Sequence, residues 1–305
     1  MRITRRLLLT GAALALGTTA LPLRRAWAVT TAEFGGMRID SLSDGWLELP
    51  ADMTLSVLPE AERAALGAQF GLTPGGVVQS PLNVTLLRHD GRVVLFDVGS
   101  GPDFMPTAGK LAEALSALDL TPDDVTDVVF THAHPDHLWG VLDDFDEPLF
   151  PAARMQMGAQ EHRFWTDPAT PAALPEAQQS FAAGAARRLE ALGEAVTTFE
   201  AGAEVLPGVV AVATPGHTPG HTSFAVGTPA EGVFVTGDFI TMPLSFARPE
   251  IGAATDHEPA QAAETRKATL ARLADEGWRI LGYHLPDGGL GQVERDGDAY
   301  RFVPG

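Results

Sequence analysis

The chain of 305 residues contains no cysteine. A metal site in it must therefore use histidine and carboxylate ligands, and a catalytic thiol is excluded. A domain of this size can bury a large core, so it does not need the disulfides on which small exported domains depend. The sequence also has no internal repeat, no low-complexity tract and no Gly/Ser linker. These absences favour a single domain.

Positive charge is scarce, because 21 Lys and Arg residues stand against 39 Asp and Glu residues. Five of the basic residues and none of the acidic ones lie in the first 28 positions, so the remainder carries 16 basic and 39 acidic residues, a formal charge of −23. A surface of this charge repels nucleic acid and anionic membranes. We therefore expect no nucleic-acid partner.

The first 28 residues have the order of an export signal. Basic residues precede an apolar stretch at 7–23, which ends at the cleavage-type pattern Ala26-Trp27-Ala28. The stretch is interrupted by polar residues and falls short of the roughly 20 apolar residues that a span needs, so we expect no stable membrane anchor. The pair Arg5-Arg6 before three leucines resembles the twin-arginine signal of bacteria. These features predict a periplasmic or secreted protein with one domain at 29–305.

Short β-type runs alternate with helical patterns along the rest of the chain. A hairpin is predicted from 83–88 and 92–97, because Asp90-Gly91 supplies the positive φ of a tight turn. The other predicted elements are strands at 125–130, 209–213, 222–226, 233–236 and 278–283, helices at 110–118, 175–192 and 259–274, and a closing hairpin at 292–303. This alternation predicts an α/β sandwich.

Three of the nine histidines fall within six residues, directly after the predicted strand 125–130. His132 and His134 point the same way in extended chain and can hold one metal ion. If Pro135 begins a helix, the side chains of Asp136 and His137 point toward the same loop from another direction and can hold a second ion. Four ligand-type side chains in one loop favour metal binding over the usual role of a lone histidine.

Three further strand ends supply the additional ligands that two ions would need. His217 follows the strand 209–213, Asp238 follows 233–236, and His284 follows the strand that ends at Tyr283. Side chains at strand ends can converge on one point without burying unpaired backbone groups. We therefore expect all three beside the His132–His137 segment.

The segment 131–137 resembles the T-H-x-H-x-D-H signature of the metallo-β-lactamase superfamily, and the later loops match its other motifs in order. The resemblance implies an αββα sandwich of two mixed β-sheets flanked by helices. It divides seven ligands between two divalent ions: His132, His134 and His217 for one, Asp136, His137 and His284 for the other, and Asp238 for both. It also implies that Asp97 supports the loop without binding metal and that His221 is structural.

Beyond the superfamily, the chain is similar to the methyl parathion hydrolase group, notably at 40–45 and 300–304. Aromatic side chains line the substrate pocket in that group, which implies this role for Phe104, Trp165 and Phe181. Ordinary core packing stays an alternative for Trp165 and Phe181.

The expected activity is attack of a metal-bridging hydroxide, oriented by Asp136, on an ester-like carbonyl or phosphoryl centre. An aromatic-lined pocket favours a small neutral substrate: a lactone, an aryl ester or an organophosphate triester. A β-lactam fits less well, because this ligand set differs from those of the β-lactamase branches. Zinc suits imidazole with carboxylate, and manganese, iron, cobalt or nickel can use the same ligands.

Two other functions are also compatible with the sequence. One is a mononuclear iron sulfur dioxygenase, whose branch of the superfamily uses an overlapping ligand set. The other is a non-catalytic periplasmic accessory protein that keeps a metal for stability. The stretch before Asn83 also leaves a homodimer open, through exposed apolar residues.

Overall fold

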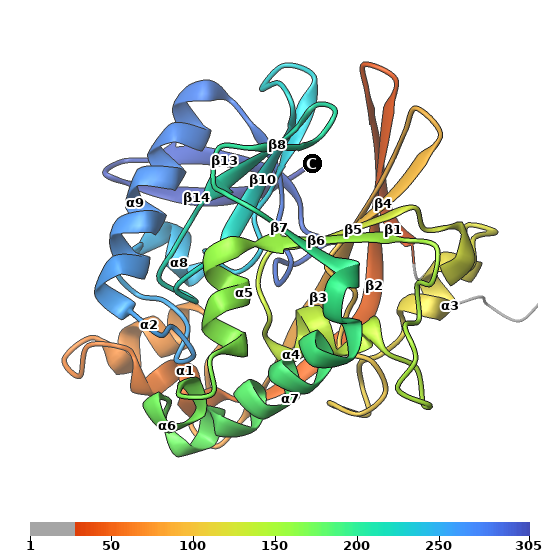
Figure 1. Cartoon of the computed structure of the whole chain (residues 1–305). Helices are drawn as coiled ribbons and strands as arrows, with labels where there is room; N and C mark the ends of the chain where they lie inside the picture. Colours follow the sequence, from red (N-terminus) through yellow and green to blue (C-terminus); the bar gives the residue numbers. More distant parts are fainter. Residues whose placement is uncertain (1–27) are drawn as a thin grey trace, which may run out of the picture.

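Residues 28–305 are described by the computed structural model, so the predicted export signal lies outside this range except for Ala28, which begins the first strand. Two sheets of seven strands form the centre of the molecule (Figure 1). The first sheet follows chain order and consists of β1 (Ala28–Phe34), β2 (Met37–Pro50), β3 (Val77–His89), β4 (Arg92–Phe96), β5 (Asp127–Phe130), β6 (Arg154–Gly158) and β7 (Val196–Phe199).

Neighbouring strands of the first sheet are antiparallel from β1 to β4 and parallel from β4 to β7. The hairpin between β3 and β4 confirms the predicted turn, because Asp90 and Gly91 have φ values of 48° and 74°. Three parallel strands in sequence place the ends of β4, β5 and β6 at one edge of the sheet. The loop with the three clustered histidines begins there, after Phe130.

The second sheet has its strands in the reverse order, β14 to β8. Its strands are β8 (Glu204–Leu206), β9 (Val209–Ala213), β10 (Thr222–Gly227), β11 (Gly232–Val235), β12 (Arg279–Leu281), β13 (Leu290–Asp296) and β14 (Ala299–Pro304). Only β11 and β12 are described as a parallel pair, so this sheet is also mixed.

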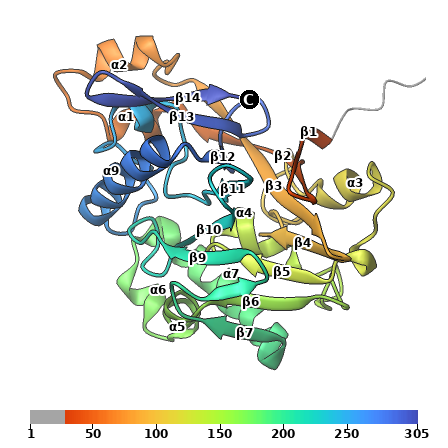
Figure 2. The ribbon, with the colours of Figure 1, turned by 90° about the horizontal axis from the view of Figure 1, so that it is seen from above.

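The helices are α1 (Ala51–Ser56), α2 (Arg63–Gln69), α3 (Leu111–Ser116), α4 (Pro135–Leu138), α5 (Ala159–Thr166), α6 (Thr170–Ala173), α7 (Glu176–Leu192), α8 (Leu244–Ala247) and α9 (Pro259–Glu276), with short 3₁₀ turns at Pro122–Asp124, Trp139–Val141 and Gly193–Ala195. α3 and α7 pack on the outer face of the first sheet and α9 on that of the second, while the other helices lie in the connecting segments. Figure 2 shows α9 on the outer side of the second sheet and α3 at the opposite side of the molecule.

Three apolar layers hold this arrangement together. Between the sheets, Val94 and Phe96 of the first pack with Phe224 and Val233 of the second. Side chains on the outer face of the first sheet pack against α3 and α7, and Ile280 and its neighbours in the second sheet pack against α9. Burial of apolar surface at roughly 25 cal/mol per Å² makes these layers the main source of stability. The predicted αββα sandwich is confirmed.

The N-terminal part contains elements that the sequence did not reveal. β1, β2, α1 and α2 precede residue 77, and α1 and α2 share a separate apolar cluster with α8. Met53, Val57 and Val77 remain exposed there, and the homodimer stays a prediction. None of the helices within residues 28–305 has the length and apolar character needed to cross a membrane.

Candidate metal centre

The seven predicted ligands converge at the edge where the two sheets meet. Three groups have ligand atoms within 4.8 Å of one another: His132 with His134 and His217, Asp136 with His137 and His284, and His132 with His137 and Asp238. We call the first group the first half-site and the second group the second half-site. All seven side chains are buried. Residues that are up to 152 positions apart in the sequence therefore form one cluster.

The first four side chains are positioned by the change from strand to helix. β5 ends at Phe130, and α4 begins at Pro135 with His134 in an extended conformation before it. Proline at the first helical position has no N–H to leave unsatisfied. The side chain of His134 projects from extended chain, whereas those of Asp136 and His137 project from the first turn of α4, as the sequence predicted.

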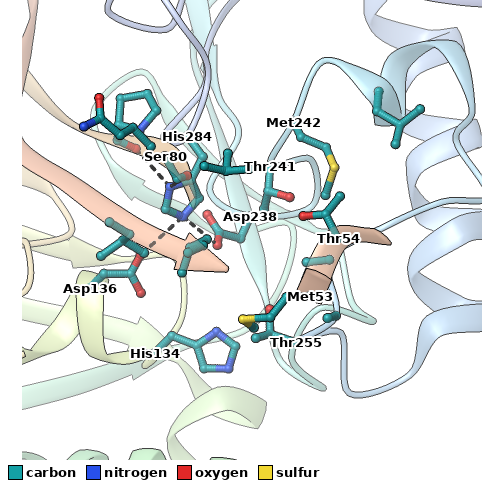
Figure 3. A pocket seen from close by; sticks show the side chains of 18 of the residues that line it. Met53, Thr54, Ser80, His134, Asp136, Asp238, Thr241, Met242, Thr255 and His284 are labelled. Carbon is teal, nitrogen blue, oxygen red and sulfur yellow. Dashed lines mark hydrogen bonds and ion pairs between the residues drawn. The ribbon is translucent and has the colours of Figure 1, made fainter. Parts of the chain in front are cut away.

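Asp238 lies between the two half-sites. Its Oδ2 is 3.4 Å from Nε2 of His217, and its Oδ1 is 3.3 Å from Nε2 of His137. Its Oδ2 is also 3.1 Å from Nε2 of His284, which in turn is 3.2 Å from Oδ2 of Asp136. Figure 3 shows His284 linked to both carboxylates. This placement suits a residue that bridges two ions.

Hydrogen bonds turn the histidine rings so that a lone pair faces the centre. Nδ1 of His137 lies 2.8 Å from Asp97, Nδ1 of His217 lies 2.9 Å from Asp256, and Nδ1 of His284 lies 3.0 Å from the carbonyl of Pro81. Each Nδ1–H donates to an oxygen, which leaves Nε2 unprotonated in the neutral ring. Such outer partners are typical of metal-binding histidines.

His134 is oriented the other way round. Its Nδ1 faces the centre, 2.9 Å from Nε2 of His217, and its Nε2 lies 3.4 Å from Nε2 of His257. His221 accepts a hydrogen bond from the backbone N–H of Asp238 at 2.8 Å and is absent from all three groups, in keeping with its expected structural role.

Buried polar atoms without partners test whether the site fits a metal. Within the described chain, nine buried side-chain polar atoms make no hydrogen bond of good geometry. Three of them lie in the cluster: Nε2 of His132, Nε2 of His137 and Oδ1 of Asp238, the last two being 3.3 Å apart. Leaving such a group unsatisfied costs about 1–3 kcal/mol each. All three belong to the metal-type groups. A divalent cation would satisfy all of them, so the residues fit the group.

The electrostatics point the same way. Burial disfavours protonation of His284, but the carboxylates of Asp238 and Asp136 outweigh burial and raise its pKa to about 10. Burial acts likewise on His137, and Asp238, Asp136 and Asp97 raise its pKa well above the ordinary value. The second half-site therefore attracts positive charge strongly. In contrast, burial lowers the pKa of His132 and His134.

A cavity of about 340 Å³ opens onto the cluster. Its wall is mostly apolar, with Leu47, Met53, Phe70, Leu72 and Met242 among the lining residues. In Figure 3, Met53 and Met242 lie across the cavity from Asp136 and His284. Of the described residues that line it, none is Lys or Arg, and the only acids are two of the predicted ligands.

The aromatic residues predicted for this pocket do not all reach it. Phe104 and Phe181 line the cavity and pack edge to face on each other, with ring centroids 6.1 Å apart. Trp165 is instead 1% exposed, donates from its indole N–H to Glu161 and packs on the outer side of His134. Its indole is therefore part of the core behind the ligands, which was the alternative for this residue.

The sequence missed several residues that support the cluster. Asp256 accepts a hydrogen bond from His217, and the hydroxyl of Tyr283 donates to the backbone carbonyl of Asp136 at 2.6 Å. Glu161 accepts hydrogen bonds from Ala133, between His132 and His134, and from Thr218, after His217. Only Tyr283 carried a signal, because it directly precedes a predicted ligand. Asp256 and Glu161 act through contacts that no local pattern shows.

The chain is similar to known hydrolases in sequence and in structure. The chain is 29% identical to the hydroxyacylglutathione hydrolase of Fuscovulum blasticum over 157 residues, which are 52% of this chain and 50% of that protein. It thus spans about half the length of this curated relative. Of solved structures, the hydrolase AbOPH of the β-lactamase superfamily superimposes with a TM-score of 0.81 at 27% identity, covering 91% of this chain and 97% of the other.

A second solved structure, the dizinc quorum-quenching lactonase AidC in complex with a product, superimposes with a TM-score of 0.83 at 23% identity. The match covers 92% of this chain and 98% of that one, and it shows the same fold. Residues 78–284, which include every predicted ligand, match the sequence model of a single family. The chain belongs to the metallo-β-lactamase superfamily.

Proposed function

We propose that this protein is a dinuclear metal-dependent hydrolase acting on a small neutral ester-like compound: a lactone, an aryl ester or an organophosphate triester. One observation carries the proposal. Two groups of ligand-type side chains lie beside Asp238 at the foot of an apolar cavity, and three buried atoms of these side chains make no hydrogen bond. Similarity to hydroxyacylglutathione hydrolase and to the hydrolase AbOPH supports hydrolysis as the reaction class.

The first half-site with Asp238 would hold one ion, and the second half-site with Asp238 would hold the other. Divalent ions bound there would supply a hydroxide nucleophile near neutral pH and polarise the electrophilic oxygen of the substrate. Zinc is the first choice for imidazole with carboxylate, with manganese, iron, cobalt and nickel as alternatives. Asp136 faces the cavity from α4, where its carboxylate can orient the attacking water.

The residues of the cavity wall are the basis for the proposed substrate class. Apolar side chains can bind an acyl or aryl group, and no lysine or arginine among the described lining residues is available to pair with an anionic group on that part of the substrate. Phe104 and Phe181 on this wall support placing the chain near the methyl parathion hydrolase group. Export through a twin-arginine signal remains part of the proposal.

A hydrolase screen on metal-reconstituted protein from residue 29 onward tests the function. We expect turnover of neutral substrates from a panel of aryl esters, lactones of increasing chain length, phosphotriesters and one β-lactam. A carboxylate added to the acyl chain of the best substrate should reduce kcat/KM, because the cavity offers it no cation. Inactivity across the panel with two ions bound would favour the accessory protein. One iron per chain with oxygen uptake on a persulfide would favour the dioxygenase.

A further inference from the structure

Glu161, in the first turn of α5, is a fully buried carboxylate that the proposed reaction does not use. Four donors surround it: the backbone N–H of Ala133 at 3.0 Å, the indole N–H of Trp165 at 2.5 Å, the hydroxyl of Thr218 at 2.7 Å and the backbone N–H of Gly220 at 3.0 Å. Burial raises the pKa of Glu161, and these donors oppose that rise. A carboxylate accepts all four bonds, whereas an amide could not.

These contacts converge on one half-site only. Ala133 lies between His132 and His134, and Thr218 directly follows His217. Trp165, held by Glu161, packs its ring on His134 with centroids 5.6 Å apart. Every ligand of the first half-site is therefore next to a residue that Glu161 binds.

The close approach of α5 to the second metal loop supports this role. A Cβ on Gly220 would lie 2.1 Å from the backbone nitrogen of Glu161, so only glycine allows the loop to reach the carboxylate. Ala133 belongs to a loop of the first sheet, and Thr218 and Gly220 belong to a loop of the second. Glu161 thus ties the two loops together, in addition to the backbone hydrogen bond from the N–H of Thr222 to the carbonyl of Thr131 at 3.0 Å.

We propose that Glu161 is a positioning residue for the first half-site, which fixes the spacing of the His132–His134 loop and the His217 loop so that their three imidazoles meet at one ion. The inference rests on the proposed metal centre. The second half-site is supported by Asp97 at His137 and by Pro81 at His284, and none of the hydrogen bonds to Glu161 involves these two residues. Asp97 also accepts from the N–H and hydroxyl of Thr131, which precedes His132. Loss of Glu161 should therefore weaken one ion and spare the other.

The test is a zinc titration of Glu161→Gln against a competing chelator. We expect two binding steps in the unmodified protein and, in the variant, one step weakened about 10- to 100-fold, as for other outer partners of metal ligands. Anomalous diffraction at the zinc edge should show reduced density at the first half-site alone. A purely structural role predicts lower stability without this split between the two ions.

Asp44→Asn is the matched control. Asp44 is also a buried carboxylate with four donors, from the N–H and hydroxyl of Ser100 and the N–H groups of Gly109 and Leu111, but it supports the loop of Phe104. This variant should lose stability and keep both zinc affinities. Should Glu161→Gln not fold, Thr218→Val removes one donor of the four and should weaken the same step by several-fold.

Unchanged zinc affinities in the folded variant, or equal weakening of both steps, would overturn the role of Glu161. Failure of the unmodified protein to bind two ions would instead overturn the proposed function. The two failures are therefore distinguishable in one titration.

Discussion

The two half-sites differ in the charge that surrounds them. The first consists of three imidazoles, and the acid behind it, Asp256, forms an ion pair with Arg266 at 3.0 Å. The second includes the carboxylate of Asp136, and Asp97 behind its His137 has no Lys or Arg partner in the described chain. Negative charge is thus neutralised behind one half-site and retained behind the other.

Ions bound at the two positions should therefore not be equivalent. In a buried site of low effective dielectric, a nearby carboxylate attracts a cation by several kcal/mol more than a neutral imidazole does. The same field raises the pKa of His137 and His284, whereas burial lowers the pKa of His132 and His134. We expect the second half-site to hold its ion more tightly.

The largest effect should come from Asp136→Asn, which removes the carboxylate that distinguishes the second half-site. With both ions bound, kcat should fall about 100- to 10,000-fold, because the water loses its orienting base. Asp123→Asn, at an exposed acid on a surface turn, is the control and should leave kcat unchanged. Full turnover of the Asp136 variant at confirmed metal content would show that Asp136 does not orient the attacking water.

A smaller effect is expected from Asp97→Asn and Asp256→Asn, compared in one chelator titration. Each should mainly weaken the ion of its own half-site, by about 10- to 100-fold, since each replaces the carboxylate that accepts from one histidine Nδ1–H by a neutral amide. Asp97 also accepts from Thr131 beside His132, so a smaller loss at the first half-site should accompany Asp97→Asn. The loss should be greater for Asp97→Asn, because no arginine offsets its charge. If both variants mainly weaken the same binding step, the two half-sites are not independent.

The smallest effect should follow Tyr283→Phe. The variant keeps the ring that stacks on His137, with centroids 3.9 Å apart, and loses the hydroxyl that donates to Asp136. Urea unfolding of the metal-free protein should show about 1 kcal/mol less stability. Tyr300→Phe, at the second tyrosine of the chain, should change stability by less than about 0.5 kcal/mol. An equal loss of stability in both variants would show that the hydroxyl of Tyr283 has no special role.

The sequence predicted the parts of the molecule that depend on local chemistry. The turn at Asp90-Gly91, the helix start at Pro135 and the strand Val209–Ala213 all followed from short-range patterns. The seven predicted ligands lie together in the structure, as expected from loops that each follow an apolar strand. The strand 278–283 was predicted too long, since hydrogen bonding in β12 covers only Arg279–Leu281.

Long-range contacts explain what was missed. β6 is a strand because it pairs between β5 and β7, although its sequence Arg-Met-Gln-Met-Gly has little β propensity. Glu161 has the sequence context of an ordinary exposed helical acid and is buried only by loops from elsewhere. The indole N–H of Trp165 donates to Glu161 in the core. That Trp165 does not line the cavity therefore could not be predicted from its being an aromatic residue.

The order of the ligands along the chain has a consequence for synthesis. His132 to His137 emerge from the ribosome early, whereas His217, Asp238 and His284 belong to the second sheet and follow much later. A growing chain cannot complete the second half-site before His284 has been made, so capture of the proposed second ion would coincide with closure of the last strands. For a protein exported already folded, the metal would then be chosen by the cytoplasm in which translation ends.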